Sequence, residues 1–90
     1  MSAPYDIHTV EYLGGHRLRL RFADGLVGEV DLAPKLESWM GPIFEPLRDP
    51  AFFGKVRVDP ESWTVVWPNG ADLAPEVLHD QSVPVRHPAN

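Results

Sequence analysis

The sequence predicts a small α+β domain with a mostly antiparallel sheet, on three observations. The chain has 90 residues, about the length of one domain. It contains ten prolines and seven glycines, which favour short elements joined by frequent turns. Between residues 8 and 32, apolar and polar residues alternate with the period of two that is typical of a half-buried strand.

The clearest strand is residues 17–22, where leucine and phenylalanine alternate with three arginines. The next strand is expected over residues 26–32. A three-residue loop with Gly25 in the left-handed conformation sets Leu18 opposite Val30, whereas a two-residue Asp-Gly turn would mix the polar and apolar faces. The same register sets Arg19 opposite Glu29, Arg17 opposite Asp31 and Phe22 opposite Leu26.

A first strand should precede this pair and enter a loop at residues 13–15. A three-residue loop there sets Val10 opposite Leu18. It also sets Glu11 opposite Arg17 and His8 opposite Leu20. Together these segments predict a three-stranded meander.

A second hairpin is expected from residues 55–58 and 63–67, which also alternate. A four-residue loop over residues 59–62 sets Val58 opposite Trp63 and Val56 opposite Val65. The following Trp67-Pro-Asn-Gly70 is a strong turn signal.

Short helices are expected at three places. Pro34 suits the first turn of a helix and Gly41 suits its end, with Leu36, Trp39 and Met40 on one face. A helical turn over residues 50–54 would bring Phe52 or Phe53 to the core, and a last helix is expected from about Ala74 to His79. The four residues 72–75 repeat residues 31–34 (Asp-Leu-Ala-Pro), which indicates the same strand-to-helix junction used twice.

The expected architecture is therefore one mostly antiparallel sheet of about five strands, the meander plus the second hairpin, with two or three short helices on one face. Residues 1–80 are expected to form this single domain. Residues 81–90 are expected to form a polar tail that contains prolines.

Composition excludes several classes of protein. There is no cysteine, which excludes disulfides, thiolate metal sites and cysteine nucleophiles and favours the cytoplasm. No segment reaches the apolar length of a membrane span. The net charge of −5 argues against general polyanion binding. The four histidines lack helical metal-ligand spacing, so neither a metal nor another cofactor is expected. They are His8, His16, His79 and His87.

Three features are candidates for an interaction surface. The first is the arginine stripe on one strand, which predicts either a solvated sheet face or a patch for an acidic partner or a nucleic-acid backbone. The second is Trp67, which like Trp39 and Trp63 is expected in the core or at its edge, but which lies beside a proline at a turn, where an exposed ring would be an interface anchor. The third is Asn69 in the same turn. The stripe consists of Arg17, Arg19 and Arg21.

Other polar residues have a structural interpretation. Asp31 and Asp72 precede helices, where exposed N–H groups favour a carboxylate, although an acid pair of the two could also serve catalysis. The remaining residues of this kind mark turns or the start of a helix: Asp24, Gly25, Gly70 and Pro75.

One run of residues is specific enough to indicate a family, namely Trp67-Pro-Asn-Gly-Ala-Asp72 with Pro75 and Glu76. With this segment and those that follow here, the chain resembles the bacterial family catalogued as domain of unknown function 2442, over about residues 8–80. The other matching segments are Phe22–Gly25, Val30–Leu32, Phe44–Leu47, Phe52 and Phe53 with Val56 and Val58, and Leu78.

The resemblance implies a small α+β domain with an antiparallel sheet, no assigned activity and no assigned catalytic residues. Some members carry a C-terminal helix-turn-helix domain, and members are often encoded beside another small protein, as toxin–antitoxin pairs are. Ten residues follow Asp80 here, too few for that domain, so we do not expect DNA binding by that route.

We therefore expect a non-catalytic protein-interaction or regulatory module, antitoxin-like, whose partner is a small protein encoded by a neighbouring gene. A homo-oligomer remains open. The first alternative is a nucleic-acid-binding accessory protein that uses the arginine stripe. The second is a small enzyme with an acid pair.

Overall fold

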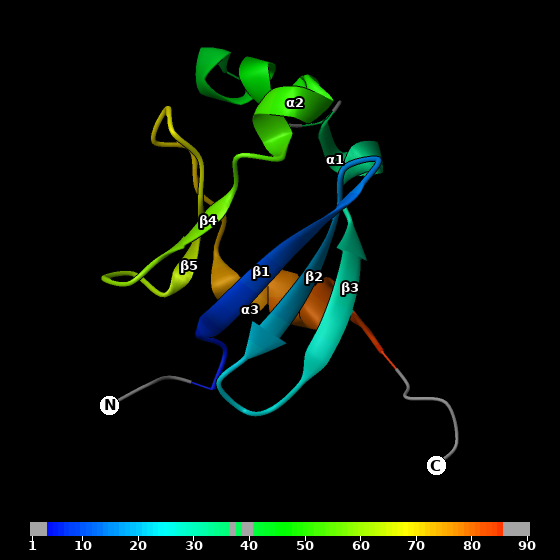
Figure 1. Cartoon of the computed structure of the whole chain (residues 1–90), viewed down its shortest axis with the longest axis vertical. Coiled ribbons are helices and arrows are strands. Elements are labelled where there is room, and N and C mark those ends of the chain that lie inside the picture. The colour runs from blue at the N-terminus through cyan, green and yellow to red at the C-terminus, as the bar shows by residue number, and fades with distance from the viewer. Residues whose placement is uncertain (1–3, 37, 39–40, 86–90) are drawn as a thin grey trace.

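The computed structural model describes residues 4–36, 38 and 41–85 and confirms the predicted α+β class. It contains a four-stranded antiparallel sheet in the order β1-β2-β3-β6, a separate two-stranded sheet of β4 and β5, and short helices (Figure 1). The strands are β1 Ile7–Gly14, β2 Arg17–Phe22, β3 Val27–Asp31, β4 Arg57–Asp59, β5 Thr64–Val66 and β6 Val83–Pro84. The helices are α1 Ala33–Leu36, the 3-10 helix η1 Pro42–Arg48, α2 Pro50–Phe53 and α3 Pro75–Gln81.

The β2–β3 hairpin has the predicted register, with Leu18 opposite Val30 and Arg19 opposite Glu29. Gly25 adopts φ +92°, and its N–H donates to the carbonyl of Phe22. Glycine adopts such a φ without steric cost, so the three-residue loop forms as the hydrophobic pattern requires.

The predicted β1–β2 register is wrong by two residues. Val10 lies opposite Leu20, and Glu11 lies opposite Arg19 rather than Arg17. The cause is a shorter turn, because Gly15 and His16 both have positive φ, of 59° and 62°. A two-residue hairpin turn needs positive φ at both central positions, and the sequence pattern does not reveal that a histidine takes the second one.

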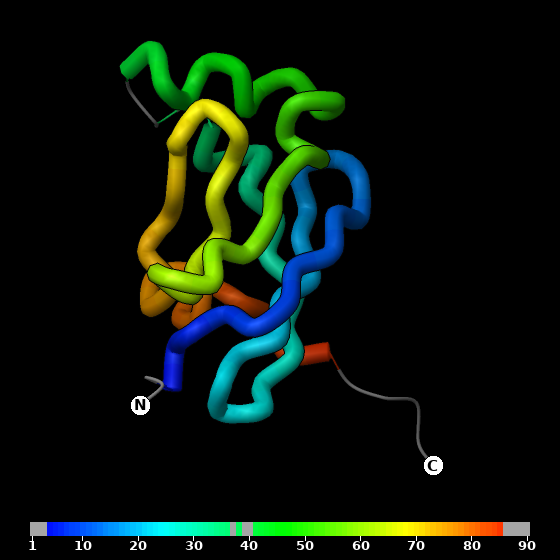
Figure 2. Tube along the Cα trace, turned by 60° about the vertical axis from the view of Figure 1, so that its left-hand side comes forward, coloured from blue at the N-terminus to red at the C-terminus, as the bar shows by residue number. Residues whose placement is uncertain are grey.

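The second hairpin is also shifted by two residues, with Val58 opposite Val65 instead of Trp63. Its loop runs from Pro60 to Trp63, and the N–H of Trp63 donates to the carbonyl of Asp59. This hairpin forms its own sheet beside β1, so the expectation of one continuous sheet is wrong (Figure 2).

The helical regions agree with expectation in part. The first described helix covers Ala33–Leu36, and most of the rest of the predicted helix, with Trp39 and Met40, lies outside the described residues. No element was predicted over Pro42–Arg48, where η1 forms with Leu47 buried. The helical turn at residues 50–54 forms as α2, and it buries Phe53.

The expected tail after residue 80 contributes to the fold. Gln81 ends α3, and β6 then pairs with β3. Ser82 passes close to Gly28, where a Cβ would meet the Ser82 Cβ at 2.6 Å. Only because residue 28 is a glycine can the chain come close enough for β6 to pair.

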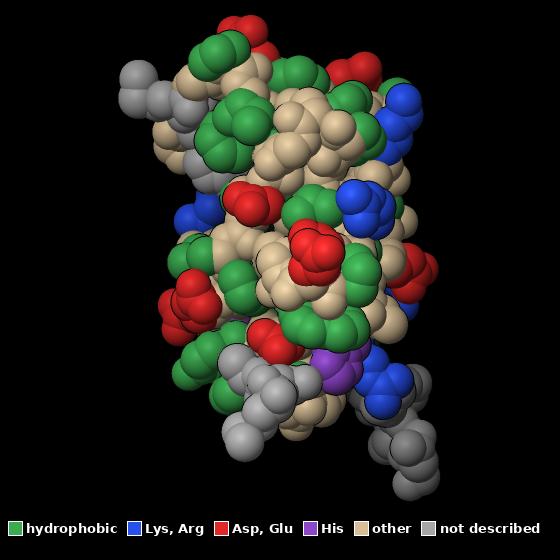
Figure 3. All heavy atoms as spheres, turned by 90° about the vertical axis from the view of Figure 1, so that its left-hand side faces the viewer, with side chains coloured by type: hydrophobic (Ala, Val, Ile, Leu, Met, Phe, Trp, Pro, Cys, Tyr) green, Lys and Arg blue, Asp and Glu red, His purple; other side chains and the backbone are tan. Residues whose placement is uncertain are grey.

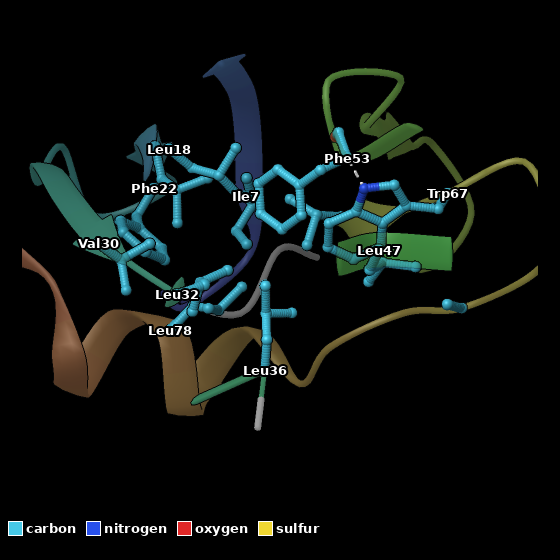
Figure 4. Packing of buried hydrophobic residues seen from close by; sticks show 13 residues of the cluster. Ile7, Leu18, Phe22, Val30, Leu32, Leu36, Leu47, Phe53, Trp67 and Leu78 are labelled. Carbon is cyan, nitrogen blue, oxygen red and sulfur yellow. Dashed lines mark hydrogen bonds between the residues drawn. The ribbon is translucent and has the colours of Figure 1, made fainter. Parts of the chain in front are cut away.

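A single core joins the two sheets and the helices (Figure 4). The inner face of the large sheet packs against α3, where Leu32 and Leu78 lie together, while Leu47, Phe53 and Trp67 fill the end covered by η1 and α2. The outer face of the large sheet is left to polar side chains. The buried apolar residues are Ile7, Leu18, Leu20, Phe22, Val30, Leu32, Leu36, Leu47, Phe53, Val65, Trp67, Ala71 and Leu78.

Candidate interaction surfaces

The arginine stripe lies on the outer face of β2, but carboxylates of the neighbouring strands pair with most of it. The carboxylate of Glu29 forms ion pairs with Nη2 of Arg17 and with Nη2 of Arg19, each at 2.9 Å. Arg19 also lies 3.6 Å from a carboxylate oxygen of Glu11. The three arginines therefore face three acids on this surface, the third being Asp31, which pairs with Arg17 in the sheet register.

The pairing perturbs the ionisation of both partners. Hydrogen bonds from Arg19 hold the pKa of Glu29 below its usual range, with the charges of Arg19 and Arg17 adding to the effect. The pKa of Arg19 is raised for the corresponding reason, chiefly its hydrogen bond to Glu29. These pairs lie on an exposed sheet face, where water and salt screen them, so the network balances charge more than it adds stability.

Arg21 differs from the other two arginines. It is exposed and makes no ion pair with any residue that the structure describes. Beside it lies a shallow hollow of about 320 Å³ that Thr9, Glu11 and Val27 also line. One arginine without an ion pair gives little attraction for a nucleic-acid backbone, because the affinity of a protein for nucleic acid grows with the number of phosphates that it neutralises.

The structure buries Trp67, which agrees with the core interpretation of the sequence and rules out the exposed anchor. Its side chain is 1% exposed, and its Nε1 donates to the carbonyl of Phe53 at 2.9 Å. The turn that follows places Pro68 outside while the indole points inward, because the apolar face of β5 continues through Trp67. Trp67 is thus unavailable to a partner.

The side chain of Asn69 links its own turn to η1 by hydrogen bonds. Its Nδ2 donates to the carbonyl of Ile43 at 2.7 Å, while its Oδ1 accepts from the N–H of Ala71 at 3.1 Å. Gly70 adopts φ +90° and donates to the carbonyl of Trp67. These contacts give Asn69 a structural role within the domain.

Of the acidic residues near turns and helix starts, Asp24 and Asp31 have hydrogen-bond partners for their carboxylates, whereas Asp72 pairs through its backbone. Asp24 accepts from the N–H of Leu26 at 2.9 Å and lies 2.7 Å from Nε2 of His79; the Leu26 bond is the largest reason why the pKa of Asp24 is lowered. Asp31 accepts from the N–H of Ala33. Asp72 forms an isolated bridge with Val66 three residues before Pro75 opens α3.

No group of three or more His, Cys, Asp or Glu side chains suited to a metal occurs among the described residues. Two histidines serve packing: His16 hydrogen-bonds the carbonyl of Leu47 at 3.1 Å, and His79 packs edge-on against Phe22. His8 lies against Trp63. His87 lies outside the described residues.

Sequence reasoning missed Trp63, which it placed in a strand. Trp63 is 38% exposed and has φ +54°, a conformation that is rare for a bulky residue and costs about 1–3 kcal/mol. Its N–H donates to Asp59, and its carbonyl accepts from the N–H of Ile7 at 2.8 Å. Both peptide groups of Trp63 are therefore hydrogen-bonded within the domain. A loop counted from Pro60 instead of Asp59 would have placed it at the hairpin tip.

The rest of the tip is equally ordered. The carboxylate of Asp59 accepts from the N–H of Glu61 at 3.1 Å and from the hydroxyl of Ser62 at 3.0 Å. These bonds, the Glu61 bond first, lower the pKa of Asp59, and the charge of Arg57 adds to the effect. The ring of His8 lies 5.5 Å from that of Trp63. We call His8, Asp59, Glu61 and Trp63 the Trp63 surface.

Figure 3 shows the side of the molecule that the β4–β5 hairpin occupies in Figure 1, with hydrophobic side chains interspersed among carboxylates. The Trp63 surface carries two carboxylates, and the charge of Arg57 on β4 acts on one of them, Asp59. An exposed aromatic ring beside carboxylates suits a partner that offers apolar and basic groups.

Comparison with known proteins gives a family and one structural relative. A family model described as "Protein of unknown function (DUF2442)" matches residues 7–84. A crystal structure from Nitrosomonas europaea, described as a "putative DNA binding protein", is 32% identical with a TM-score of 0.61. The match covers 70% of this chain and 39% of that one. No curated protein matches.

No helix among the described residues is long and apolar enough to span a membrane.

Proposed function

The chain belongs to the family of proteins of unknown function DUF2442, and we propose that it is a non-catalytic, cytoplasmic protein-interaction module that binds a partner through the Trp63 surface. The observation that carries the proposal is the exposed position of Trp63, whose side chain is 38% exposed. Its backbone has a positive φ and is held by hydrogen bonds to both adjacent peptide groups.

The energetics favour a functional explanation for this arrangement. A strained conformation persists only when the surrounding structure over-determines it, and such residues cluster at functional sites. Tryptophan is also among the residue types most often found as energetic anchors of protein interfaces. Because the backbone that carries the ring is already held in place, less conformational entropy is lost when a partner covers it.

The charge distribution supports a protein partner with basic groups. The chain has 13 acidic and 8 basic residues, and the arginines of the sheet face are balanced by acids. A regulatory, antitoxin-like role follows the same logic, with a small protein encoded by a neighbouring gene as the first partner to test.

The test is co-purification of the tagged chain from nuclease-treated extract, followed by titration of the identified, purified partner. Trp63→Gly removes the ring and suits the positive φ, so the domain should fold and binding should weaken by at least about tenfold. Ile43→Gln is the matched control, because Ile43 is similarly exposed, at 42%, on η1. Equal binding by Trp63→Gly and wild type would overturn the proposal.

A second candidate function is nucleic-acid binding through the arginine stripe, which the relative from Nitrosomonas europaea favours by its description. Arg21 is the residue to change, because Arg17 and Arg19 are paired with acids. This function requires duplex DNA binding that weakens with salt and is lost in Arg21→Glu. If the chain does not bind DNA at low salt, this candidate is excluded.

A further inference from the structure

The turn that follows β5 contains Asn69 and Gly70, and asparagine is among the chemically labile residues of proteins. The nitrogen of the next peptide group can attack the side-chain carbonyl carbon of an asparagine, and glycine hinders this attack least because it has no side chain. Both residues are exposed to water, which the second half of the reaction consumes. The turn therefore supplies the groups that the spontaneous loss of an asparagine amide needs.

The folded turn opposes this reaction through three hydrogen bonds. Nδ2 of Asn69 donates to the carbonyl of Ile43 at 2.7 Å, and Oδ1 accepts from the N–H of Ala71 at 3.1 Å. The N–H of Gly70, whose nitrogen is the attacking atom, donates to the carbonyl of Trp67 at 2.9 Å. Attack requires this nitrogen to give up its proton and the planar amide to turn freely, so the hydrogen bonds must open before the reaction proceeds.

The hydrogen bond between Asn69 and Ile43 depends on the position of η1. The turn, drawn in yellow, lies beside η1, drawn in green (Figure 2). Burial of Leu47 holds η1 in place, and Nε2 of His16 adds a hydrogen bond to the Leu47 carbonyl at 3.1 Å. A displacement of η1 takes the Ile43 carbonyl away and frees the Asn69 amide. The reactivity of Asn69 is therefore coupled to a contact with the β1–β2 hairpin.

We propose that Asn69 is a deamidation site whose reaction is controlled by detachment of the turn from η1, and whose product keeps the two apart. The Gly70 nitrogen loses its proton and forms a bond to Cγ of Asn69, while the bond from Cγ to Nδ2 breaks and ammonia leaves. Water then opens the cyclic imide at either of its carbonyl groups. One product is aspartate, and the other is isoaspartate, in which the main chain runs through the side-chain carbons.

Both products lack the donor that bonds to Ile43. A carboxylate at position 69 offers only acceptor oxygens to the carbonyl oxygen of Ile43, and two acceptors in contact repel each other. Isoaspartate also lengthens the main chain of the turn, which displaces the Gly70 N–H from the Trp67 carbonyl. Because neither product reverts spontaneously to asparagine, the modification is a one-way release of the turn from η1.

Mass spectrometry of proteolytic peptides follows the conversion of Asn69 in the full-length chain kept in mildly alkaline buffer. The folded chain should convert at least about tenfold more slowly than the chain unfolded in urea, because the reaction passes through the opened turn. His16→Gly removes the hydrogen bond to Leu47 and suits the positive φ of 62°, so this variant should fold. It should convert Asn69 about two- to tenfold faster than wild type. Leu47→Val loosens the same contact and replaces it if it does not fold.

Three further variants serve as controls and as a product analogue. Glu45→Ala changes an exposed side chain of η1 and should leave the rate unchanged. Asn69→Gln keeps an amide on a longer side chain and should not convert over the same period. In Asn69→Asp the carboxylate still accepts from Ala71 but cannot donate to η1. The Phe44 N–H, which donates to Gly41, should therefore exchange faster with solvent in this variant.

Several results would overturn the proposal. If the folded and the unfolded chain convert at the same rate, the hydrogen bonds of the turn do not control the reaction, and if neither converts, Asn69 is not a modification site. Equal rates in wild type and in the folded His16→Gly variant would refute the coupling to η1. Unchanged amide shifts and exchange of η1 in Asn69→Asp would refute the release. None of these results depends on Trp63, so this proposal and the proposed function fail independently.

Discussion

Replacing Gly28 by alanine should detach β6 from the sheet. The new Cβ would lie 2.6 Å from the Ser82 Cβ and 3.2 Å from its Oγ. Ordinary carbon contacts need about 3.5–4.0 Å, so the two backbones must separate by about 1 Å. Ser82 cannot rotate away, because the closest atom is its Cβ and its hydroxyl donates to the carbonyl of Leu78.

The magnitude follows from two opposing contributions. Overpacking of this kind costs about 1–3 kcal/mol. The lower entropy of the unfolded chain with alanine returns about 0.4–1 kcal/mol. We therefore expect Gly28→Ala to lower the free energy of unfolding by about 1–2 kcal/mol, or Tm by about 5–15 °C for a domain of this size.

Urea denaturation and amide hydrogen exchange measure the two consequences. The Val85 N–H, which donates to Val27, should lose protection in Gly28→Ala. In a Ser82→Gly background the same substitution should cost less than about 0.5 kcal/mol, because the opposing Cβ is absent. A Tm within about 2 °C of wild type, with Val85 still protected, would refute the reasoning.

Three further variants test the fold and the loops. Trp63→Gly should be more stable than Trp63→Ala by about 1 kcal/mol, because φ +54° favours glycine; denaturation in the reverse order would contradict this. Trp67→Phe should lose about 2–3 kcal/mol in the same assay, since the smaller ring leaves a cavity and the carbonyl of Phe53 keeps only the N–H of Val56 as a donor; a near-neutral effect would contradict this. The pKa of Asp24 is lowered in the folded protein, first by the hydrogen bond from the Leu26 N–H. The ionised carboxylate therefore stabilises the fold fully above the pKa of the unfolded chain, about 3.9, and this stabilisation is lost as the pH falls below that value. The stability difference between wild type and Asp24→Asn should therefore shrink in acid, and a difference that is constant from about pH 2 to 6 would contradict this assignment.

The sequence predicted elements well where hydrophobic period and turn chemistry agree. In the β2–β3 hairpin, the alternation of residues 18–22 and the need for Gly25 at positive φ select one register. Likewise, the Asp-Leu-Ala-Pro segments correctly marked where α1 and α3 begin, because proline suits the first turn of a helix.

The sequence failed where a non-glycine residue adopts positive φ. His16 and Trp63 both do so, and each shifts its hairpin by two residues. A shift of two keeps the same faces buried, so the hydrophobic pattern cannot detect it. The same error hid the Trp63 surface, since Trp63 was assigned to a strand, opposite Val58, and not to the tip of the hairpin.

The measurement that tests the central claim most directly is ¹⁹F NMR of the chain labelled with 5-fluorotryptophan. The Trp63 resonance is identified as the one missing in Trp63→Gly. If Trp63 anchors a protein partner, this resonance should shift or broaden in nuclease-treated extract that contains the partner and should be unaffected by duplex DNA at low salt. An unchanged Trp63 resonance in an extract from which the chain captures its partner would contradict the account, as would a response to DNA alone.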